Sequence, residues 1–511
     1  MLRDRSALSR RSVLAGLLAG AATPVLATAP LRSPRPPARP ASAQIAALAP
    51  EAGAARSVPT GALSAVLERA GLTGDTTVIA VDAETGAVIE EHRADLRVPP
   101  ASTAKALTTM YALQTLGTEF RFTTRVETGA GARIENGTLR GDLVLRGGGD
   151  PTLQTDHLAR LAAELVERGL RRIEGRFIVD DQALPAIEQI DPEQPVAAGY
   201  NPGIAGLNLN FNRVYFGWEV ANGRAQLSMD ARSDREVPPV SVIGIEAVSR
   251  DLPVYTYASR GGRERWTVAA SALNQSGSRW LPVRRPAAYA GDVFRMLLAA
   301  RGCQLPEPRL QSVPAGQILA EHRSETLPGV LRDMLRYSTN ITAECAGLAA
   351  TLRQGRAVQG LAPSAARLNA WVAERYGASG LALQDHSGLA EASRVSVRSM
   401  ASYLVAARRE GILPGLLRDH QMRDANGRPQ TNHPVEVRAK TGTLDFVSAL
   451  AGYAQPRGGR PIAFAIVSAD LPRRESTRSE ESERPAGARA WTGRARTLQQ
   501  DLIERWAGLH G

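Results

Sequence analysis

The pattern of hydrophobic and polar residues first predicts a β-hairpin followed by a helix. Thr77–Val81 and Ala87–Glu91 are strand-forming segments joined by a short turn-forming stretch, which is typical of two antiparallel strands. Two consecutive prolines, Pro99 and Pro100, then stop the chain just before Thr103–Thr115, which has the pattern of a helix. The folded part of the chain is therefore expected to open with strand, strand and helix.

The middle of the chain, from about residue 121 to 285, has a different pattern. Short strand-like segments alternate there with turns rich in Gly and Asn, which predicts a β-rich unit. The expected strands are Phe122–Glu127, Leu139–Arg146, Arg176–Asp180 and Ser241–Val248, with a hairpin at Asn136-Gly137 and one helix at His157–Arg168.

Helical patterns return after this unit, and strands follow them. The expected helices are Asp292–Arg301, Pro328–Tyr337, Thr342–Gln354, Ala365–Tyr376 and Val397–Arg409; the expected strands are Glu436–Lys440, Val447–Tyr453 and Ile462–Ser468, before a last helix at Leu498–Ala507. Residues 471–490 mix Arg and Glu with Ser, Pro and Gly and are expected to form a solvated loop. This order favours an α+β core whose sheet combines the first hairpin with the last strands.

The first 29 residues have the pattern of an export signal. Arg10 and Arg11 precede an apolar run over Val13–Leu26, and small residues up to Ala29 supply a cleavage-like position. The arginine pair resembles a bacterial twin-arginine signal, with an ordinary Sec signal as the alternative. A run of about 14 residues is shorter than the roughly 20 that a membrane span needs. We therefore expect a signal peptide removed near Ala29 and a soluble periplasmic protein, at most peripherally associated with the membrane.

The domain organisation follows from these patterns. Residues 30–57 are rich in Pro, Ala and Arg without periodicity, which predicts a flexible linker, and folded structure should begin near residue 58. The predicted segments are a signal peptide (1–29), the linker (30–57), a main α+β domain (58–121 and 286–511) and an inserted β-rich unit (122–285).

Composition and charge narrow the functional classes. The 511 residues carry 62 Lys and Arg against 51 Asp and Glu, but no long run of like charges occurs and aromatic residues make up only 5%. These features disfavour a nucleic-acid-binding protein. Seven histidines without metal-ligand spacing, and only two cysteines, argue against a metal site. No cofactor is expected, and it stays open whether Cys303 and Cys345 form a disulfide.

The distribution of lysine is the most informative part of the composition. Of the 62 basic residues, only Lys105 and Lys440 are lysine. A composition that has moved so far toward arginine retains lysine chiefly where arginine cannot replace it, and only lysine can give up its proton near neutral pH. These two positions are therefore the first candidates for chemistry.

Lys105 follows Ser102 by three residues. On a helix, residues three apart share a face, so the Lys105 amine can reach the Ser102 hydroxyl. Serine needs an adjacent base to act as a nucleophile, and a desolvated lysine can serve as that base. The position just after two prolines places Ser102 at a helix N-terminus, where developing negative charge is favoured.

Two further motifs complete a set of three. One motif ends a predicted strand and consists of Lys440, Thr441 and Gly442. The amine of the lysine and the hydroxyl of the threonine can bind a carboxylate. The glycine lets the backbone of a substrate approach closely. Between this motif and the first lie Ser338 and Asn340, two residues apart at the junction of two predicted helices. On its own this pair would be interpreted as a helix cap.

The three motifs in this order are the pattern of serine β-lactamases and penicillin-binding proteins. Over residues 75–510 the chain resembles the D-alanyl-D-alanine carboxypeptidase/endopeptidase type, the low-molecular-mass class C penicillin-binding proteins. The segments that carry the resemblance are Pro99–Lys105, Gly147–Leu153, Leu207–Asn212, Asp385–Leu389, Arg438–Thr443 and Ala451–Tyr453. The long stretch between Ser-x-x-Lys and Ser-x-Asn is similar to this group rather than to the β-lactamases. His386 departs from the family pattern, which more often has glycine; this departure indicates either a modestly altered rim of the cleft or no functional change.

The resemblance implies the serine β-lactamase/DD-peptidase fold, α+β with a β-rich insert, and a catalytic sequence. Ser102 would attack the carbonyl between the terminal D-alanines of a peptidoglycan stem peptide, and Lys105 would take its proton. Ser338 would relay a proton to the leaving amine, near Lys440. Water would then hydrolyse the acyl-enzyme without a metal or nucleotide. β-Lactams would acylate Ser102 as covalent inhibitors.

The resemblance also implies the substrate-binding residues. Asn340 would orient the substrate amide, and Lys440 and Thr441 would hold the terminal carboxylate beside Gly442. Backbone N–H groups of Ser102 and Thr443 would form the oxyanion hole. The balance of carboxypeptidase and endopeptidase activity and the oligomeric state stay open.

Other functions have weaker support in the sequence. The nearest alternative is a serine β-lactamase on the same fold, and a non-catalytic wall-binding protein would not need all three motifs. Asp385, His386 and Ser387 have the residue types of a catalytic triad, but sequence neighbours rarely converge on one point. The glycines of Gly147–Asp150 lack the following Lys-Ser/Thr of a phosphate loop and predict a structural turn.

Overall fold

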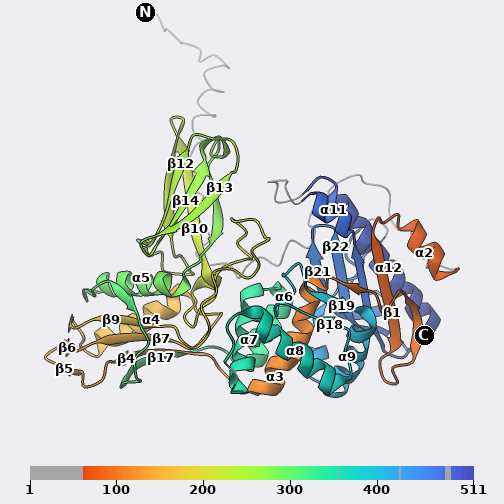
Figure 1. Cartoon of the computed structure of the whole chain (residues 1–511), viewed down its shortest axis with the longest axis horizontal. Helices are drawn as coiled ribbons and strands as arrows, with labels where there is room; N and C mark the ends of the chain where they lie inside the picture. The colour runs from red at the N-terminus through yellow and green to blue at the C-terminus, as the bar shows by residue number, and fades with distance from the viewer. Residues whose placement is uncertain (1–60, 356, 425–426, 478–484, 511) are drawn as a thin grey trace, which may run out of the picture.

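The computed structural model describes residues 61–355, 357–424, 427–477 and 485–510. The expected signal peptide, the linker and the expected start near residue 58 lie outside the described residues. Figure 1 shows two bodies side by side, one built on a large sheet and one made of the inserted residues. Among the described residues, no helix is long and apolar enough to cross a membrane.

The larger body is built on a six-stranded antiparallel sheet in which both ends of the chain meet. Its strands, in spatial order, are β2 (Val88–His92), β1 (Asp75–Asp82), β23 (Ile462–Ala469), β22 (Val447–Pro456), β21 (Val435–Leu444) and β20 (Arg418–Asp419). The first hairpin therefore pairs with the last strands through β1 and β23, with Val78 opposite Ile466. This confirms the sheet that the order of elements predicted.

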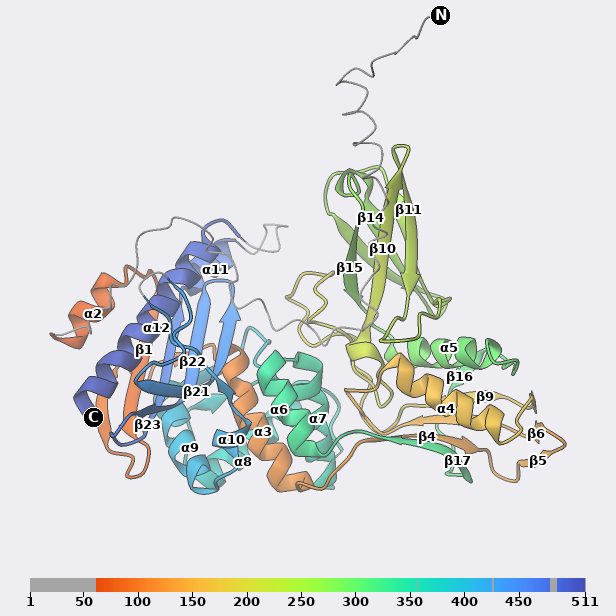
Figure 2. The same cartoon turned by 180° about the vertical axis from the view of Figure 1, so that it is seen from behind.

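Both faces of this sheet are covered by helices. Val78 and Ala80 of β1 pack with Trp506 on the side of α12 (Ala488–His510), whereas Ile79 and Val81 belong to the cluster on the opposite face. The elements on that opposite face are α3 (Ala104–Leu116), α6 (Leu327–Tyr337), α7 (Asn340–Arg353), α8 (Leu361–Tyr376), α9 (Val397–Arg409) and α10 (Leu413–Leu416), while α2 (Leu63–Arg69) packs beside α12. Figures 1 and 2 show this three-layer arrangement from both sides.

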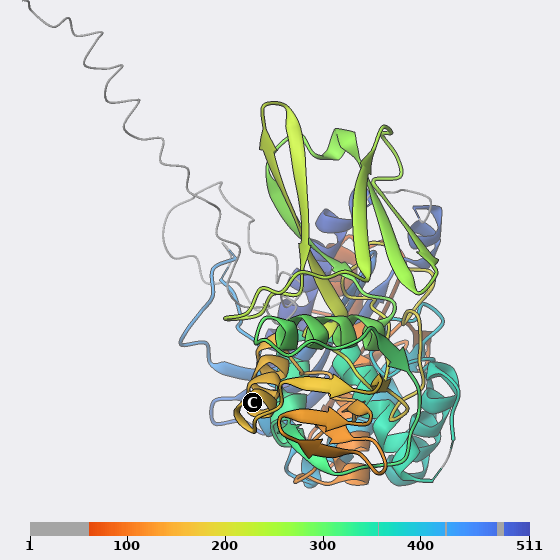
Figure 3. The same ribbon diagram turned by 90° about the vertical axis from the view of Figure 1, so that its left-hand side faces the viewer.

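The insert contains its own mixed sheet and a projecting β-rich part. The mixed sheet has the order β16 (Pro308–Leu310), β9 (Phe177–Asp180), β7 (Leu143–Gly147), β4 (Thr123–Thr128) and β17 (Ile318–Arg323), and packs against α4 (Thr155–Glu167) and α5 (Pro286–Ala299). The projecting part holds two three-stranded sheets: β11 (Arg224–Asp230), β10 (Arg213–Ala221) and β15 (Gly277–Pro282), and β12 (Ile243–Val248), β14 (Arg263–Ala269) and β13 (Tyr255–Arg260). Figure 3 shows these long strands rising above the mixed sheet.

Two small three-stranded sheets complete the fold. One small sheet joins β5 (Arg133–Glu135), β6 (Thr138–Arg140) and β8 (Arg172–Glu174), and another joins β18 (Leu381–Ala382), β19 (Arg394–Ser396) and β3 (Arg97–Val98). The β5–β6 connection confirms the hairpin expected at Asn136-Gly137. The single strand expected over Leu139–Arg146 is wrong, because Gly141 adopts a φ of 125° and separates β6 from β7.

The predicted return of the chain from the insert at residue 286 is wrong. Helix α5 packs on the mixed sheet of the insert, and β17 pairs antiparallel with β4, with His322 opposite Thr124. The chain re-enters the larger body at Ser324, whose N–H donates to the Phe122 carbonyl at 2.9 Å. The prediction failed because it took the change from strand to helix pattern as a domain boundary. The helix itself starts at Pro286, which suits the first helical turn.

The solvated loop predicted over residues 471–490 is wrong at both ends. Leu471–Ser476 forms α11, whose N-terminus is capped by Asp470 accepting a hydrogen bond from the Arg473 N–H at 3.1 Å. Helix α12 begins at Ala488, ten residues before the predicted Leu498. Residues 478–484, between the two helices, lie outside the described residues.

Candidate active site

The three sequence motifs converge at the edge of the large sheet. Ser102 lies in the 3₁₀ turn η1 (Ala101–Thr103) that leads into α3, and Lys105 lies in the first turn of that helix. Ser338 occupies the junction between α6 and α7 in a left-handed conformation (φ 58°, ψ 38°), with Asn340 at the start of α7. Lys440 comes from β21. Residues more than 300 positions apart thus meet in one place.

Lys105 is the centre of the hydrogen-bond network. Its side chain is fully buried, and its Nζ lies 3.0 Å from Ser102 Oγ, 2.8 Å from Asn340 Oδ1 and 2.8 Å from the Ser387 carbonyl oxygen. A neutral amine has two N–H donors and one lone pair. If Asn340 and Ser387 accept the two N–H groups, the lone pair faces the Ser102 hydroxyl. The geometry therefore fits a lysine that can take the proton of Ser102.

Lys440 lies on the other side of the serine pair. Its Nζ donates to Ser338 Oγ at 2.9 Å and to the Thr441 carbonyl at 2.6 Å, and only 2% of the residue is exposed. Along β21 the exposed Thr441 alternates with the buried Lys440 and Gly442, as expected for successive residues of a strand. Thr443 is partly exposed, and its Oγ1 accepts a hydrogen bond from Arg496 at 3.5 Å.

Gly442 lets β21 approach the turn that carries Ser102. A Cβ at this position would lie 2.9 Å from the Ser102 nitrogen and 2.9 Å from Ala101 Cβ, closer than side chains tolerate. Because Gly442 has no side chain, β21 can lie close to the backbone of Ser102. This close approach is needed if the N–H groups of Ser102 and Thr443 are to bind one oxyanion together.

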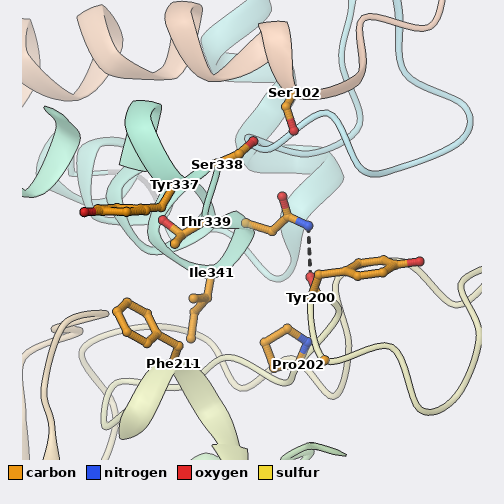
Figure 4. A pocket seen from close by; sticks show the side chains of 10 residues that line it. Ser102, Tyr200, Pro202, Phe211, Tyr337, Ser338, Thr339 and Ile341 are labelled. Carbon is orange, nitrogen blue, oxygen red and sulfur yellow. Dashed lines mark hydrogen bonds between the residues drawn. The ribbon is translucent and has the colours of Figure 1, made fainter. Parts of the chain in front are cut away.

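A pocket that is open to solvent lies beside Ser102. One side comes from the motif Ser338–Asn340 with its neighbours, and the other comes from the insert. Asn340 Nδ2 donates to the Tyr200 carbonyl at 2.9 Å, which ties the two sides together (Figure 4). The lining residues are Ser102, Gly199, Tyr200, Pro202, Phe211, Tyr337, Ser338, Thr339, Asn340 and Ile341.

Sequence reasoning missed this contribution of the insert. Phe211 lies within a segment that carried the family resemblance, but Gly199–Pro202 has no motif of its own. Sequence reasoning also missed the Ser387 carbonyl as a partner of Lys105, because backbone groups leave no residue-type signal.

The departure of His386 from the family pattern suggested an altered rim of the cleft. His386 does not lie at that rim. The residue is fully buried, and its Nε2 lies 2.7 Å from Ser364 Oγ. Its ring lies against Gly347 of α7, where there is no room for a Cβ, and stacks on Tyr111 with centroids 6.3 Å apart. Burial lowers the pKa of His386 to about 3, so the ring is neutral at physiological pH.

The residues Asp385–Ser387 do not form a catalytic triad. His386 contacts Ser364 rather than Ser387. The Asp385 carboxylate accepts hydrogen bonds from the N–H groups of Gly388, Leu389 and Ala390, which makes it the cap of a tight loop. The structure therefore agrees with the sequence argument against a triad.

The two cysteines are both buried free thiols in separate hydrophobic clusters, so they form no disulfide. Within the described ranges, His, Cys, Asp and Glu side chains nowhere gather in a group of three that could hold a metal ion.

The fold and the site together define a serine enzyme of the penicillin-binding type, with a lysine amine in hydrogen-bond contact with a serine hydroxyl at a helix start. Residues 60–489 match the family model of the D-Ala-D-Ala carboxypeptidase 3 (S13) family, and the chain belongs to that family. This assignment confirms the family that the motifs indicated.

Similar proteins agree with this assignment. The chain is 27% identical over 465 residues to a D-alanyl-D-alanine carboxypeptidase of Actinomadura sp. (strain R39), covering 80% of each chain. It is 25% identical over 425 residues to D-alanyl-D-alanine carboxypeptidase DacB of Haemophilus influenzae, covering 76% of this chain and 83% of that protein. The crystal structure of penicillin binding protein 4 from H. influenzae has the same fold, with a TM-score of 0.69, 22% identity, and coverage of 86% of this chain and 99% of that one.

Proposed function

We propose that the protein is a serine D-Ala-D-Ala carboxypeptidase/endopeptidase that cleaves peptidoglycan stem peptides through an acyl-enzyme on Ser102. The observation that carries the proposal is the position of the Lys105 amine, within hydrogen-bond distance of both Ser102 Oγ and Asn340 Oδ1. A serine nucleophile needs an adjacent base within hydrogen-bond reach, and the buried Lys105 amine is in position to be that base.

Acylation would proceed through groups that are already in contact. Lys105 takes the Ser102 proton as Oγ bonds to the carbonyl carbon between the two D-alanines, and the N–H groups of Ser102 and Thr443 hold the oxyanion. Ser338, hydrogen-bonded to the Lys440 ammonium, passes a proton to the leaving amine. The C–N bond breaks, D-alanine or a cross-linked peptide departs, and water hydrolyses the ester.

Substrate recognition would involve the second lysine and the amide. Asn340, anchored by Lys105 and the Tyr200 carbonyl, orients the substrate amide. Lys440 and the exposed Thr441 hydroxyl bind the terminal carboxylate next to Gly442. β-Lactams present the same carboxylate and a strained amide, and would acylate Ser102 as covalent inhibitors; a crystal structure of the H. influenzae protein is of a β-lactam complex.

The test is the site and fate of a penicillin adduct. Mass spectrometry of the digested adduct should locate the label on the peptide that contains Ser102, and Ser102→Ala should take up none. Undiminished labelling of Ser102→Ala would overturn the mechanism. Digestion of purified monomeric and cross-linked muropeptides should release D-alanine, cross-link cleavage products, or both. A serine β-lactamase, the alternative on this fold, would instead release its penicilloyl group at once and leave muropeptides intact.

We also propose that the chain is exported to the periplasm through the twin-arginine route. The proposal rests on Arg10 and Arg11 before a weakly apolar run, and a peptidoglycan substrate lies outside the cytoplasm. Replacing both arginines by lysine should leave precursor in the cytoplasm, because the guanidinium pair is read by a receptor. Normal export of the double variant would indicate the Sec route.

A further inference from the structure

Glu344 is a buried carboxyl that the proposed reaction does not use. It lies on α7, one turn after Asn340, and its side chain is fully buried. Its Oε2 accepts a hydrogen bond from the His386 N–H at 2.9 Å, and its Oε1 accepts one from the Ser387 N–H at 2.8 Å. Both oxygens therefore hold the backbone of the loop that lies under Lys105.

The same loop supplies a ligand to Lys105. The Ser387 carbonyl accepts from Lys105 Nζ at 2.8 Å, immediately after the N–H that Glu344 holds. A second anchor comes from α3, where Thr108 Oγ1 donates to the His386 carbonyl at 2.6 Å. Gly388, at a φ of 73°, packs directly on the Ala101 carbonyl, beside the nucleophile. A shift of Glu344 would therefore move the Ser387 carbonyl that contacts the Lys105 amine.

We propose that Glu344 is a positioning residue for acylation, whose carboxyl group fixes the Ser387 carbonyl that holds Lys105. The proposal rests on the proposed role of Lys105 as the base.

The titratable groups that act on Glu344 come from α3, from the loop and from its own helix. The groups around it are Lys105 from α3, Asp385 and His386 from the loop, and Cys345 from its own helix; Asp150 of the insert acts on Cys345. Burial keeps His386 and Cys345 neutral by lowering the pKa of the imidazole and raising that of the thiol. Burial, and next the Asp385 charge, raise the pKa of Glu344, while the Lys105 charge opposes this rise.

The raised pKa favours the neutral acid form of Glu344. A neutral carboxyl group still offers lone pairs to the N–H groups of His386 and Ser387. The role of Glu344 at this loop is therefore its hold on the backbone.

Glu344→Gln tests the proposal, because it preserves size but removes one of the two acceptors that hold the loop. The measurement is stopped-flow acylation over a range of concentrations of one chromogenic penicillin. We expect the limiting acylation rate constant to fall on the order of tenfold, since the Ser387 carbonyl is displaced. The apparent dissociation constant of the penicillin should stay unchanged, because Glu344 lines no part of the pocket. A limiting rate constant equal to that of the parent protein would overturn the proposal.

Thr108→Val is the matched second variant. It removes the other anchor of the same loop, so it should also lower the limiting rate constant and leave the dissociation constant of the penicillin unchanged. If Glu344→Gln does not fold, Glu344→Asp replaces it: a retained but displaced carboxyl group should lower the limiting rate constant, and a rate constant identical to that of the parent would overturn the proposal.

The outcomes separate this proposal from the proposed function. If the parent protein is not labelled on Ser102 by penicillin, the proposed function fails. If labelling occurs on Ser102 and only the limiting rate constant of the Glu344 variant contradicts expectation, the role of Glu344 alone fails.

Discussion

At the scale of single residues, each of two buried lysines contacts a serine, and the groups around the two amines differ. Lys105 has a serine hydroxyl, an amide oxygen and a backbone carbonyl around its Nζ, an arrangement that a neutral amine satisfies. Lys440 contacts Ser338 and its neighbour's carbonyl at the edge of the pocket, where a lasting positive charge can bind a carboxylate.

Changing each lysine to arginine should therefore have different effects. Arginine cannot be deprotonated in a protein, so Lys105→Arg should lose acylation by at least about a thousandfold, the scale of losing a general base. Lys440→Arg retains a cation and should chiefly weaken recognition of peptides and penicillins. Stopped-flow acylation with one β-lactam compares the two. Faster acylation by Lys105→Arg than by Lys440→Arg would mean that Lys105 is not the base.

His386 gives a prediction about pH and stability. Its pKa falls from 6.5 to about 3 on burial, so between these pH values the unfolded chain binds a proton at this residue that the folded chain does not. The free energy of unfolding should therefore decrease as pH falls through this window. In His386→Gln that decrease should be shallower by up to about 1.4 kcal/mol per pH unit, measured by urea unfolding.

Ser364→Ala is the control for His386→Gln. It removes the partner of the imidazole, 2.7 Å away, but leaves the titrating group in place. Its stability should fall at every pH with a slope close to that of the parent protein. If the free energy of unfolding of His386→Gln changed with pH as steeply as that of the parent protein, the assignment of this pH dependence to His386 would be refuted.

At the scale of elements, the site depends on how closely β21 approaches η1. The contact has room for the glycine at position 442 and for no larger residue, since a Cβ there would lie 2.9 Å from the Ser102 nitrogen. Ser338 lies at a helix junction in a left-handed backbone conformation, and its hydroxyl contacts the Lys440 amine. Catalytic geometry is thus set by where elements end and meet.

Gly442→Ala should separate the strand from the nucleophile turn. The clash involves backbone atoms, which cannot rotate away as a side chain can, so we expect acylation to fall by about a hundredfold, the scale of a 1 Å misplacement. Gly493→Ala in α12 is the matched control, because a Cβ there meets nothing within 4 Å. It should leave acylation unchanged and stabilise the helix by about 0.5–1 kcal/mol. Normal acylation by Gly442→Ala would contradict this account of the oxyanion site.

At the scale of the whole molecule, the insert and the larger body share an apolar cluster. Phe211 and Leu184 of the insert pack with Ile341, Leu348 and Leu444 of the larger body. The cluster lies under the pocket, and the Asn340–Tyr200 hydrogen bond crosses the same boundary. The insert therefore contributes a wall of the active site in addition to having its own core.

Phe211→Ala should affect both stability and substrate binding. Truncating a buried phenylalanine costs about 3–5 kcal/mol, and here it also removes part of the pocket wall. Phe177→Ala is the matched control, because Phe177 is equally large and buried but packs only within the insert. Calorimetry should find both variants destabilised, whereas peptide hydrolysis should give a raised KM for Phe211→Ala alone. Equal KM values in the two variants would refute a role of the insert in binding.

The sequence determined the parts of this protein that local geometry fixes. Ser102 and Lys105 lie three residues apart on one helical turn, so their contact was predictable without a tertiary structure. The rarity of lysine singled out the same two positions that the fold brings together, and the family resemblance supplied their partners Ser338 and Asn340. Element types were also largely predictable, because hydrophobic patterns record which faces are buried.

Tertiary structure decided everything that depends on long-range pairing. The end of the insert is set by the pairing of β17 with β4, and no local pattern distinguishes a helix that packs on one sheet from a helix that packs on another. The burial of His386 follows from its contact with Gly347, and the role of the Ser387 carbonyl follows from a loop held by Glu344. Such contacts join residues whose types carry no signal of their partners, because packing and backbone hydrogen bonds are specified only once the chain has folded.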